Sequence, residues 1–378
     1  MDVTQKVKLP RDLYVLCNKI LKLAPWNIIA ILLAGSLSRG EGTTIKKGNQ
    51  VHVLSDYDLE VIVRVYDPLF IRRANRLEKN SSLNVRIGII PAFSLKSLKL
   101  IQMYELKKKG LLLIGNRDVL NQIPMDSPKD IPLLEGVRRL LNGIIDMIEA
   151  IRYENIKGKL SHNQVHKLIY SSSKAYLACC SALLTLIGEY RPTYRDRCIL
   201  FARLFKAHFK DLNKTFADFP EQVQRALDFK LRPDLSVFNK PLDEWFKAKN
   251  YILATLEYFL TKYFSENNDL FISLEKLQNL PIQPIFNFYY ALNSILFLKK
   301  IPPLKSFFTV PMIAIQISAV FLICSISEKN GSIDLDMLKK AKEYISTIYR
   351  TKGLSLDWDL LRNIIIKTWK IAPEYTST

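Results

Sequence analysis

The chain has 378 residues, 48% hydrophobic and 24% charged, which is long enough for two or three domains and excludes a disordered chain. Its 55 Lys and Arg residues outnumber 36 Asp and Glu residues, leaving a formal net charge of +19. That charge favours polyanionic partners such as nucleotides, RNA or an anionic membrane surface, or it serves solubility alone. The basic residues are spread along the chain, which excludes a single basic tail.

The cysteines indicate the redox environment. The five cysteines show no metal-ligand spacing, and Cys179 and Cys180 lie side by side in an apolar, helical segment. We therefore expect reduced thiols in a cytoplasmic protein, without a disulfide framework. The first residues, MDVTQKVKLPRDLY, do not combine a basic stretch with an apolar one, so no export signal is expected.

Short apolar runs alternate with helical patterns from residue 11 to about residue 124. In chain order, the patterns predict a helix at 11–24, strands at 27–35 and 56–65, a helix at 68–80, a strand at 83–92, a helix at 96–110 and a strand at 111–115. This alternation is typical of an α+β fold with a small mixed sheet. We predict that residues 1–124 form this first domain.

Strand signals fade beyond about residue 131. Helical periods are then found at 131–156, 162–189, 193–213, 220–230, 240–265, 284–299, 306–327 and 334–350. The proline-bearing stretch 121–136 is the predicted hinge. We therefore predict a large all-helical C-terminal domain at 131–378, with further prolines indicating a subdivision near 270–305.

One apolar stretch, FFTVPMIAIQISAVFLICSI at 307–326, has the length of a bilayer-spanning helix. However, Pro311, Gln316 and Ser318 interrupt it, and the amphipathic LDMLKKAKEYISTIYR follows. We expect a buried helix of the helical domain and no membrane span, with a true span as the alternative.

Two short polar motifs lie at the ends of the predicted strands. In ILLAGSLSRGEG the first strand ends at Gly35 and Ser36, where free backbone N–H groups and a hydroxyl at the start of a helix suit a phosphate. Asp56 and Asp58 lie two residues apart on the next strand, so they share one face, and Glu60 follows on that face. Like charges repel, so such a pair favours magnesium ions that bridge to a polyphosphate.

This pattern resembles the nucleotidyltransferase superfamily, which includes DNA polymerase beta and the kanamycin nucleotidyltransferases. The matching segments are Gly35-Ser36 with the flanking LSRGE, the strand SDYDLEV, and YELKKKGLLLIGNRDVL at 104–120. The resemblance implies magnesium-dependent transfer of a nucleoside monophosphate from a nucleoside triphosphate to an acceptor, with release of pyrophosphate. It implies that Gly35 and Ser36 hold the triphosphate and that Asp56 and Asp58 bind magnesium.

The sequence departs from the family pattern in two places. Residues 37–55 make a longer connection than usual, and GTTIKKGNQVHV within it predicts an inserted turn or hairpin. The family usually carries a third catalytic carboxylate on a later strand, whereas LNVRIGIIPA offers Arg86 and Gly88 and no acid. Glu60 is the candidate substitute. Otherwise the acceptor is activated differently, or nucleotide is bound without turnover.

Other residues have two interpretations each. Arg39 could clamp a phosphate or lie on a solvated helix face. His162 and His166 have the spacing of a metal pair on a helix, but such a pair is more often a surface face. Lys46 and Lys47 could steer the triphosphate or form a charged turn. The residues that either face the acceptor or form a helix–helix corner are Tyr190, Tyr194, Arg195 and Arg197.

The predicted function is therefore magnesium-dependent nucleotidyl transfer to an unidentified acceptor, which could be a small molecule, a sugar phosphate, a protein side chain or an RNA end. The alternative is a catalytically degenerate nucleotide- or RNA-binding regulator of the toxin–antitoxin type. A membrane-associated protein is a third alternative.

Overall fold

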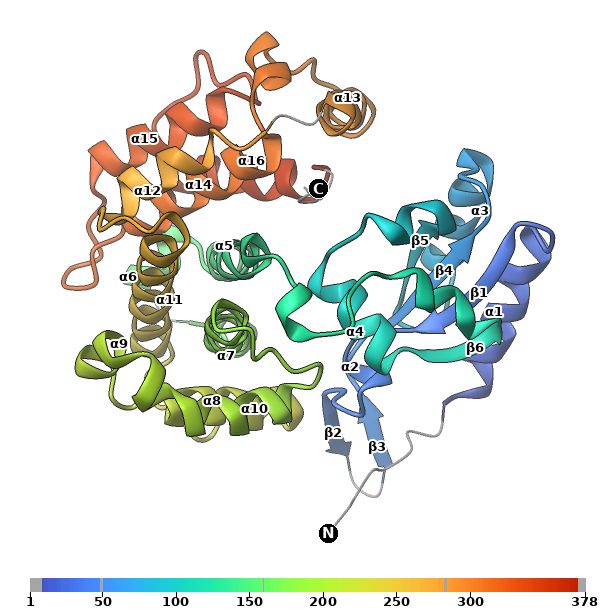
Figure 1. Cartoon of the computed structure of the whole chain (residues 1–378). Coiled ribbons are helices and arrows are strands. Elements are labelled where there is room, and N and C mark those ends of the chain that lie inside the picture. Colours follow the sequence, from blue (N-terminus) through green and yellow to red (C-terminus); the bar gives the residue numbers. More distant parts are fainter. Residues whose placement is uncertain (1–8, 48–49, 159, 282–283, 373–378) are drawn as a thin grey trace.

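The computed structural model describes residues 9–47, 50–158, 160–281 and 284–372 (Figure 1). Its first part contains a four-stranded sheet in the order β5-β4-β1-β6. Strand β4 (Tyr57–Val63) is parallel to β5 (Val85–Pro91), whereas β1 (Ile28–Leu33) is antiparallel to both β4 and β6 (Leu111–Gly115). The predicted strands are confirmed, and the sheet is mixed as expected.

Helices cover both faces of this sheet. Alternate residues of β4, Leu59, Val61 and Val63, pack in the core beneath α1 (Arg11–Leu23) and α3 (Pro68–Lys79). Ile62 points to the other face, where α4 (Ile101–Lys109) packs with the 3-10 turns η1 (Ala92–Lys96) and η2 (Arg117–Gln122). Because side chains alternate along a strand, Asp58 and Glu60 belong to this second face.

The connection between the two motifs is a hairpin. Strands β2 (Thr44–Lys47) and β3 (Gln50–Val53) pair antiparallel, with Thr44 opposite Val53. The expected inserted hairpin is therefore confirmed. The side chains of Lys46 and Lys47 lie outside the described part of the chain, so their predicted role is not addressed.

The second part of the chain is helical, and every helical segment that the sequence predicts is found. After the short turn η3 (Pro128–Asp130) come α5 (Leu133–Ala150), α6 (Tyr153–Lys157), α7 (His162–Leu186), α8 (Tyr194–His208), α9 (Lys210–Thr215), α10 (Phe219–Leu231), α11 (Pro241–Phe264), α12 (Leu270–Leu277), α13 (Pro284–Asn293), the π turn η4 (Ser294–Leu298), the 3-10 turn η5 (Leu304–Phe308), α14 (Pro311–Cys324), α15 (Leu335–Ser346) and α16 (Trp358–Trp369). Helices α12 and α16 were not predicted. One continuous core joins these helices from Leu134 to Ile365.

Helix α14 is the apolar stretch that raised the question of a membrane span. All its residues from Pro311 to Ile323 are buried among other helices. Its polar side chains have partners, since Gln316 Nε2 donates to Asn142 Oδ1 at 2.8 Å and Ser318 Oγ donates to the Ala341 carbonyl at 2.7 Å. The prediction of a buried helix is confirmed. Within the described ranges, no helix is both long and apolar enough to cross a membrane.

Candidate functional site

The glycine-serine corner and the aspartate pair meet at one end of the sheet. The chain leaves β1 at Ala34, whose N–H donates to the Asp58 carbonyl at 2.7 Å, and turns at Gly35 with φ +69° into the short helix α2 (Gly35–Ser38). A Cβ on Gly35 would lie only 2.1 Å from Oδ2 of Asp58. The Asp58 carboxylate therefore lies directly against the Gly35 backbone, a position that only glycine permits.

Asp56 lies immediately before β4, one position outside the strand. Its Oδ1 accepts a hydrogen bond from the Asn84 side-chain amide, and the Asn84 carbonyl accepts from the Tyr57 N–H at 2.8 Å. The start of β5 thus fixes Asp56 beside Asp58. The structure brings the two predicted metal ligands together.

Burial and the neighbouring charges act in opposite directions on the pKa of the Asp58 carboxyl. Burial raises the pKa of the Asp58 carboxyl, and Asp56 raises it further, while Arg86, Arg39 and Lys230 act in the opposite direction. The net pKa is raised, so the ionised carboxylate lacks full compensation from the surrounding protein. A cation at this position would supply the missing positive charge.

The donors present fit magnesium better than a protein-only metal cage. Among the described residues no group of three or more His, Cys, Asp and Glu side chains is arranged to hold a metal ion. Magnesium, however, is commonly held by one or two carboxylates together with substrate phosphates and water. Asp56 and Asp58 match that pattern. His162 and His166 belong to no such group, and the His166 ring lies 6.2 Å from the Tyr170 ring in a stacked arrangement.

Ser36 lies at the entrance of α2. Its hydroxyl donates to Ser55 Oγ at 3.3 Å, and Ser55 Oγ also accepts the Thr43 N–H at 2.8 Å. The hairpin insertion is therefore tied to the corner that carries Ser36. This contact holds Ser36 close to the aspartate pair, although the connection between the two motifs, residues 37–55, is long.

Glu60 lies on the same face of β4 as Asp58. The ladder with β5 is unbroken, placing Asp58 opposite Arg86 and Glu60 opposite Gly88. A Cβ on Gly88 would lie 2.2 Å from Oε2 of Glu60, so the glutamate lies over the bare backbone of β5. The strand alternation assumed for Glu60 is confirmed. Its catalytic role stays a prediction.

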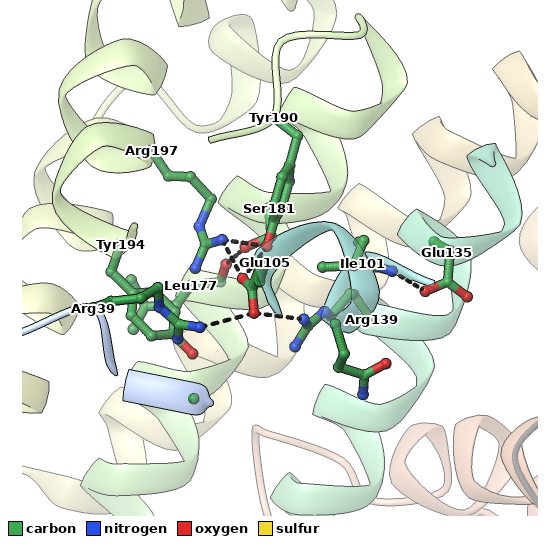
Figure 2. Close-up of polar contacts among 12 residues, drawn as sticks. Arg39, Ile101, Glu105, Glu135, Arg139, Leu177, Ser181, Tyr190, Tyr194 and Arg197 are labelled. Carbon is green, nitrogen blue, oxygen red and sulfur yellow. Dashed lines mark hydrogen bonds and ion pairs between the residues drawn. The ribbon is translucent and has the colours of Figure 1, made fainter. Parts of the chain in front are cut away.

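Behind this corner, a buried ion-pair network surrounds Glu105 of α4 (Figure 2). Arg39 Nη1 lies 2.9 Å from Glu105 Oε2, and Arg197 Nη1 lies 2.9 Å from Oε1. Arg139 lies 3.9 Å from Oε2, and the Tyr190 hydroxyl donates to Oε1 at 2.5 Å. Burial alone would raise the pKa of the Glu105 carboxyl, but the three arginines lower it to about 2.

This network joins the two parts of the molecule. Arg39 and Glu105 belong to the α/β part, whereas Arg139, Tyr190 and Arg197 belong to the helical part. Figure 1 shows α2 and α4 on the side of the sheet that faces the helical part. The ion pairs therefore fix the orientation of the helices relative to the aspartate pair.

Glu41 makes a second connection between the parts. Its buried carboxylate accepts hydrogen bonds from the N–H groups of Tyr194 and Arg195, both at 2.8 Å. These N–H groups lie in the first turn of α8, where they have no carbonyl partner within the helix. Arg39 Nε lies 3.6 Å from the same carboxylate. Arg39 is thus engaged by Glu41 and Glu105, and its role as a phosphate clamp stays a prediction.

The helical part contributes a lysine to the site. Lys230 of α10 is only 9% exposed; its Nζ lies 5.4 Å from the centre of the Tyr194 ring, and its charge acts on Asp58. Burial would raise the pKa of the Tyr194 hydroxyl, but Lys230, Arg39, Arg197 and Arg139 together lower it. A positively charged wall therefore faces the carboxylates. An anionic substrate such as a triphosphate would be attracted to this wall.

The residues that connect the helical part to the aspartate pair are only partly predicted from the sequence. The sequence singles out Arg39 and the set Tyr190, Tyr194, Arg195 and Arg197, whereas it assigns no role to Glu41, Glu105 or Lys230. Glu41 and Glu105 lie within the segments that carry the family resemblance, but no local pattern marks them as buried partners of the helical part.

Comparison of the chain with protein-family models, with curated proteins and with solved structures finds no match.

Proposed function

We propose that the protein is a magnesium-dependent nucleotidyltransferase, which moves a nucleoside monophosphate from a nucleoside triphosphate to an acceptor. The observation that carries this proposal is the contact between Gly35 and the Asp58 carboxylate at the end of β1. It places a backbone corner able to approach a phosphate next to a pair of carboxylates that need a cation. The resemblance to the nucleotidyltransferase superfamily rests on these same residues.

Each part of the site has a role in this proposal. Asp56 and Asp58 hold magnesium, which supplies charge neutralisation on the triphosphate and polarises the transferring phosphoryl group. Gly35 and Ser36 hold the phosphates through backbone N–H groups and a hydroxyl. Lys230 adds a positive charge from the helical part, on the side of Asp58.

Incubation with each alpha-labelled nucleoside triphosphate, with and without magnesium, tests the proposal. Fractions of a cell extract serve as the source of acceptor, and released pyrophosphate is measured in parallel. The expected result is labelled product that forms only with magnesium. Absence of magnesium-dependent binding for every nucleoside triphosphate would contradict the proposed function.

A second candidate is a protein that binds nucleotide or RNA without turnover. The sequence of β5 favours it, because the position opposite Asp58 holds Arg86 and the position opposite Glu60 holds Gly88. No carboxylate of β5 therefore faces the aspartate pair. Magnesium-dependent nucleotide binding without labelled product in any fraction would support this candidate.

Glu60 is the candidate for the carboxylate that β5 lacks, and its role in transfer has a test of its own. If Glu60 activates the acceptor, Glu60→Gln should lower the transfer rate about a hundredfold while leaving the affinity for the triphosphate nearly unchanged, because the group acts on the acceptor hydroxyl. Rates and affinities are measured with the same nucleotide and magnesium. Normal transfer by Glu60→Gln would assign Glu60 a structural role over Gly88.

Lys230 tests the contribution of the helical part. We expect Lys230→Met to raise the KM for the triphosphate about tenfold or more, because a charged hydrogen bond to phosphate is lost while the aliphatic stem is kept. Lys206→Met, on the exposed surface of α8, is the control for net charge. Equal KM values for Lys230→Met and wild type would remove Lys230 from the site.

A further inference from the structure

One region of the helical part has its apolar side chains on the outside. It runs from α13 through the π turn η4 to the 3-10 turn η5. Phe297, Leu304 and Phe308 are 69%, 76% and 70% exposed. We call this region the α13–η5 surface; its exposed apolar residues are Phe288, Tyr289, Leu292, Ile295, Leu296, Phe297, Ile301, Leu304, Phe307 and Phe308.

Polar side chains hold this region from the inside. The buried Asn287 side chain donates to the carbonyls of Ser306, Phe307 and Thr309 at 3.1, 3.0 and 2.8 Å. The buried Ser294 hydroxyl donates to the Lys300 carbonyl at 3.1 Å. Besides Tyr290 and Ala291, the buried side chains of this region are therefore partly polar and hydrogen-bonded, while many of its large apolar side chains are exposed, which is unusual for a folded chain. An exposed apolar patch of this extent marks an interaction site.

The charge of the region has one sign. No Asp or Glu occurs between Glu275 and Glu328 in the sequence, whereas Lys299, Lys300 and Lys305 lie exposed among the apolar side chains. Within the described residues, no ion pair involves any of these three lysines; Lys300 Nζ lies 4.5 Å from the centre of the Tyr349 ring. Aromatic and aliphatic groups interspersed with lysines are typical of surfaces that lie in the interface of an anionic membrane.

We propose that the α13–η5 surface docks the protein peripherally on an anionic lipid membrane. The apolar side chains would enter the boundary between headgroups and acyl chains, and the three lysines would contact the anionic headgroups. This inference is independent of the nucleotidyltransferase proposal, because it rests on residues outside the aspartate site.

The charge distribution favours lipid over the other partners. A second copy of this chain docked by two-fold symmetry would bring the same lysines of both copies together without an acidic residue of the region to compensate them. RNA would engage the lysines but would leave most of the aliphatic side chains exposed to water. An anionic membrane satisfies both the apolar and the basic groups.

Co-sedimentation of the full chain with phosphatidylcholine vesicles, with and without phosphatidylserine, tests the proposal. We expect binding to the vesicles that contain phosphatidylserine, weakened by salt. Replacing Lys299, Lys300 and Lys305 with Ser should weaken partitioning by about fivefold per lysine, on the order of a hundredfold for the three.

Figure 1 places α8 and α9 at the end of the helical part opposite α13. The matched control for charge is a triple Ser variant of three exposed basic residues of α8 and α9, Arg203, Lys206 and Lys210. It removes the same charge from a different location. A loss of binding as large as that of the lysine variant of the α13–η5 surface would overturn the proposal, because attraction would then depend on net charge alone.

The apolar part has its own test. Phe297→Ser and Phe308→Ser should each weaken partitioning about tenfold, since each removes an inserted aromatic ring. Ile199→Ser, on exposed α8, should leave partitioning unchanged. Thermal unfolding of each variant verifies that it is folded. Absence of vesicle binding by wild type, or a concentration-dependent dimer in solution that Phe297→Ser abolishes, would overturn the proposal in favour of a protein partner or a second copy.

Discussion

Asp56→Ala and Asp58→Ala should each lower the proposed magnesium-dependent nucleotidyl transfer by on the order of a hundredfold or more, because in the proposed mechanism each variant removes one ligand of the metal that would stabilise the transition state. The affinity for the triphosphate in magnesium should fall as well. Single-turnover rates and equilibrium binding, each over a magnesium titration, measure the two effects. Unchanged affinity and turnover in both variants would show that the metal-site assignment is wrong.

The melting temperature of Asp58→Asn shows whether a substitution at this position impairs activity without impairing folding. Folding raises the pKa of the Asp58 carboxyl. The contribution of this carboxyl to the free energy of unfolding is therefore present below its unfolded pKa and is lost as the pH rises through its folded pKa. At neutral pH without magnesium, Asp58→Asn should therefore melt at a higher temperature than wild type. Magnesium with nucleotide should raise the melting temperature of wild type and not that of Asp58→Asn.

The corner that carries Gly35 and the strand that carries Asp58 could be predicted because both signals are local. A buried apolar run that ends in glycine, and alternation along the next run, suffice to bring these groups to one end of the sheet. The inserted hairpin was predicted for the same reason. Asp56 lies one position before β4, a small difference because strand ends are the least certain part of a periodic pattern.

The two missed helices show where periodicity alone fails. Helix α12 has eight residues, close to two turns, so its apolar period is too short to recognise. Its N-cap signal is present, since the Asp269 side chain accepts from the N–H groups of Phe271 and Ile272. The Asp357 side chain caps α16 in the same way, through the Leu360 N–H. An aspartate N-cap thus marks the start of both helices in the sequence.

The ion-pair network lies beyond local sequence signals. Glu105 sits in YELKKKG, where three lysines follow it, and the pattern suggests a solvated helix face. Its partner Arg197 is separated from it by 92 positions, and the two side chains meet only in the folded chain. Lys230 reaches the site in the same way. Such pairs follow from tertiary packing, which hydrophobic periodicity does not specify.

Glu105→Gln should lower the free energy of unfolding by about 3–5 kcal/mol at neutral pH, because it leaves Arg197 buried without its anion and leaves Arg39 with Glu41 as its remaining carboxylate, 3.6 Å away. Gln keeps the volume of the side chain, so the loss reports charge and not packing. Denaturant unfolding measures it. Asp336→Asn, which breaks an exposed ion pair with Lys339 on α15, is the matched control and should change stability by less than about 1 kcal/mol.

The pH dependence of this difference identifies its cause. Folding lowers the pKa of the Glu105 carboxyl from 4.5 to about 2, so its stabilising contribution is present above the unfolded pKa and is lost as the pH falls through the folded pKa. Over that window, wild type should lose about 3 kcal/mol relative to Glu105→Gln. The two unfolding curves should therefore converge between about pH 5 and pH 2. A difference in the free energy of unfolding that stays constant with pH would contradict this explanation. The ionised Glu105 carboxylate would then not be the group that holds Arg39 and Arg197 together, and with them the position of Lys230 relative to the aspartate pair.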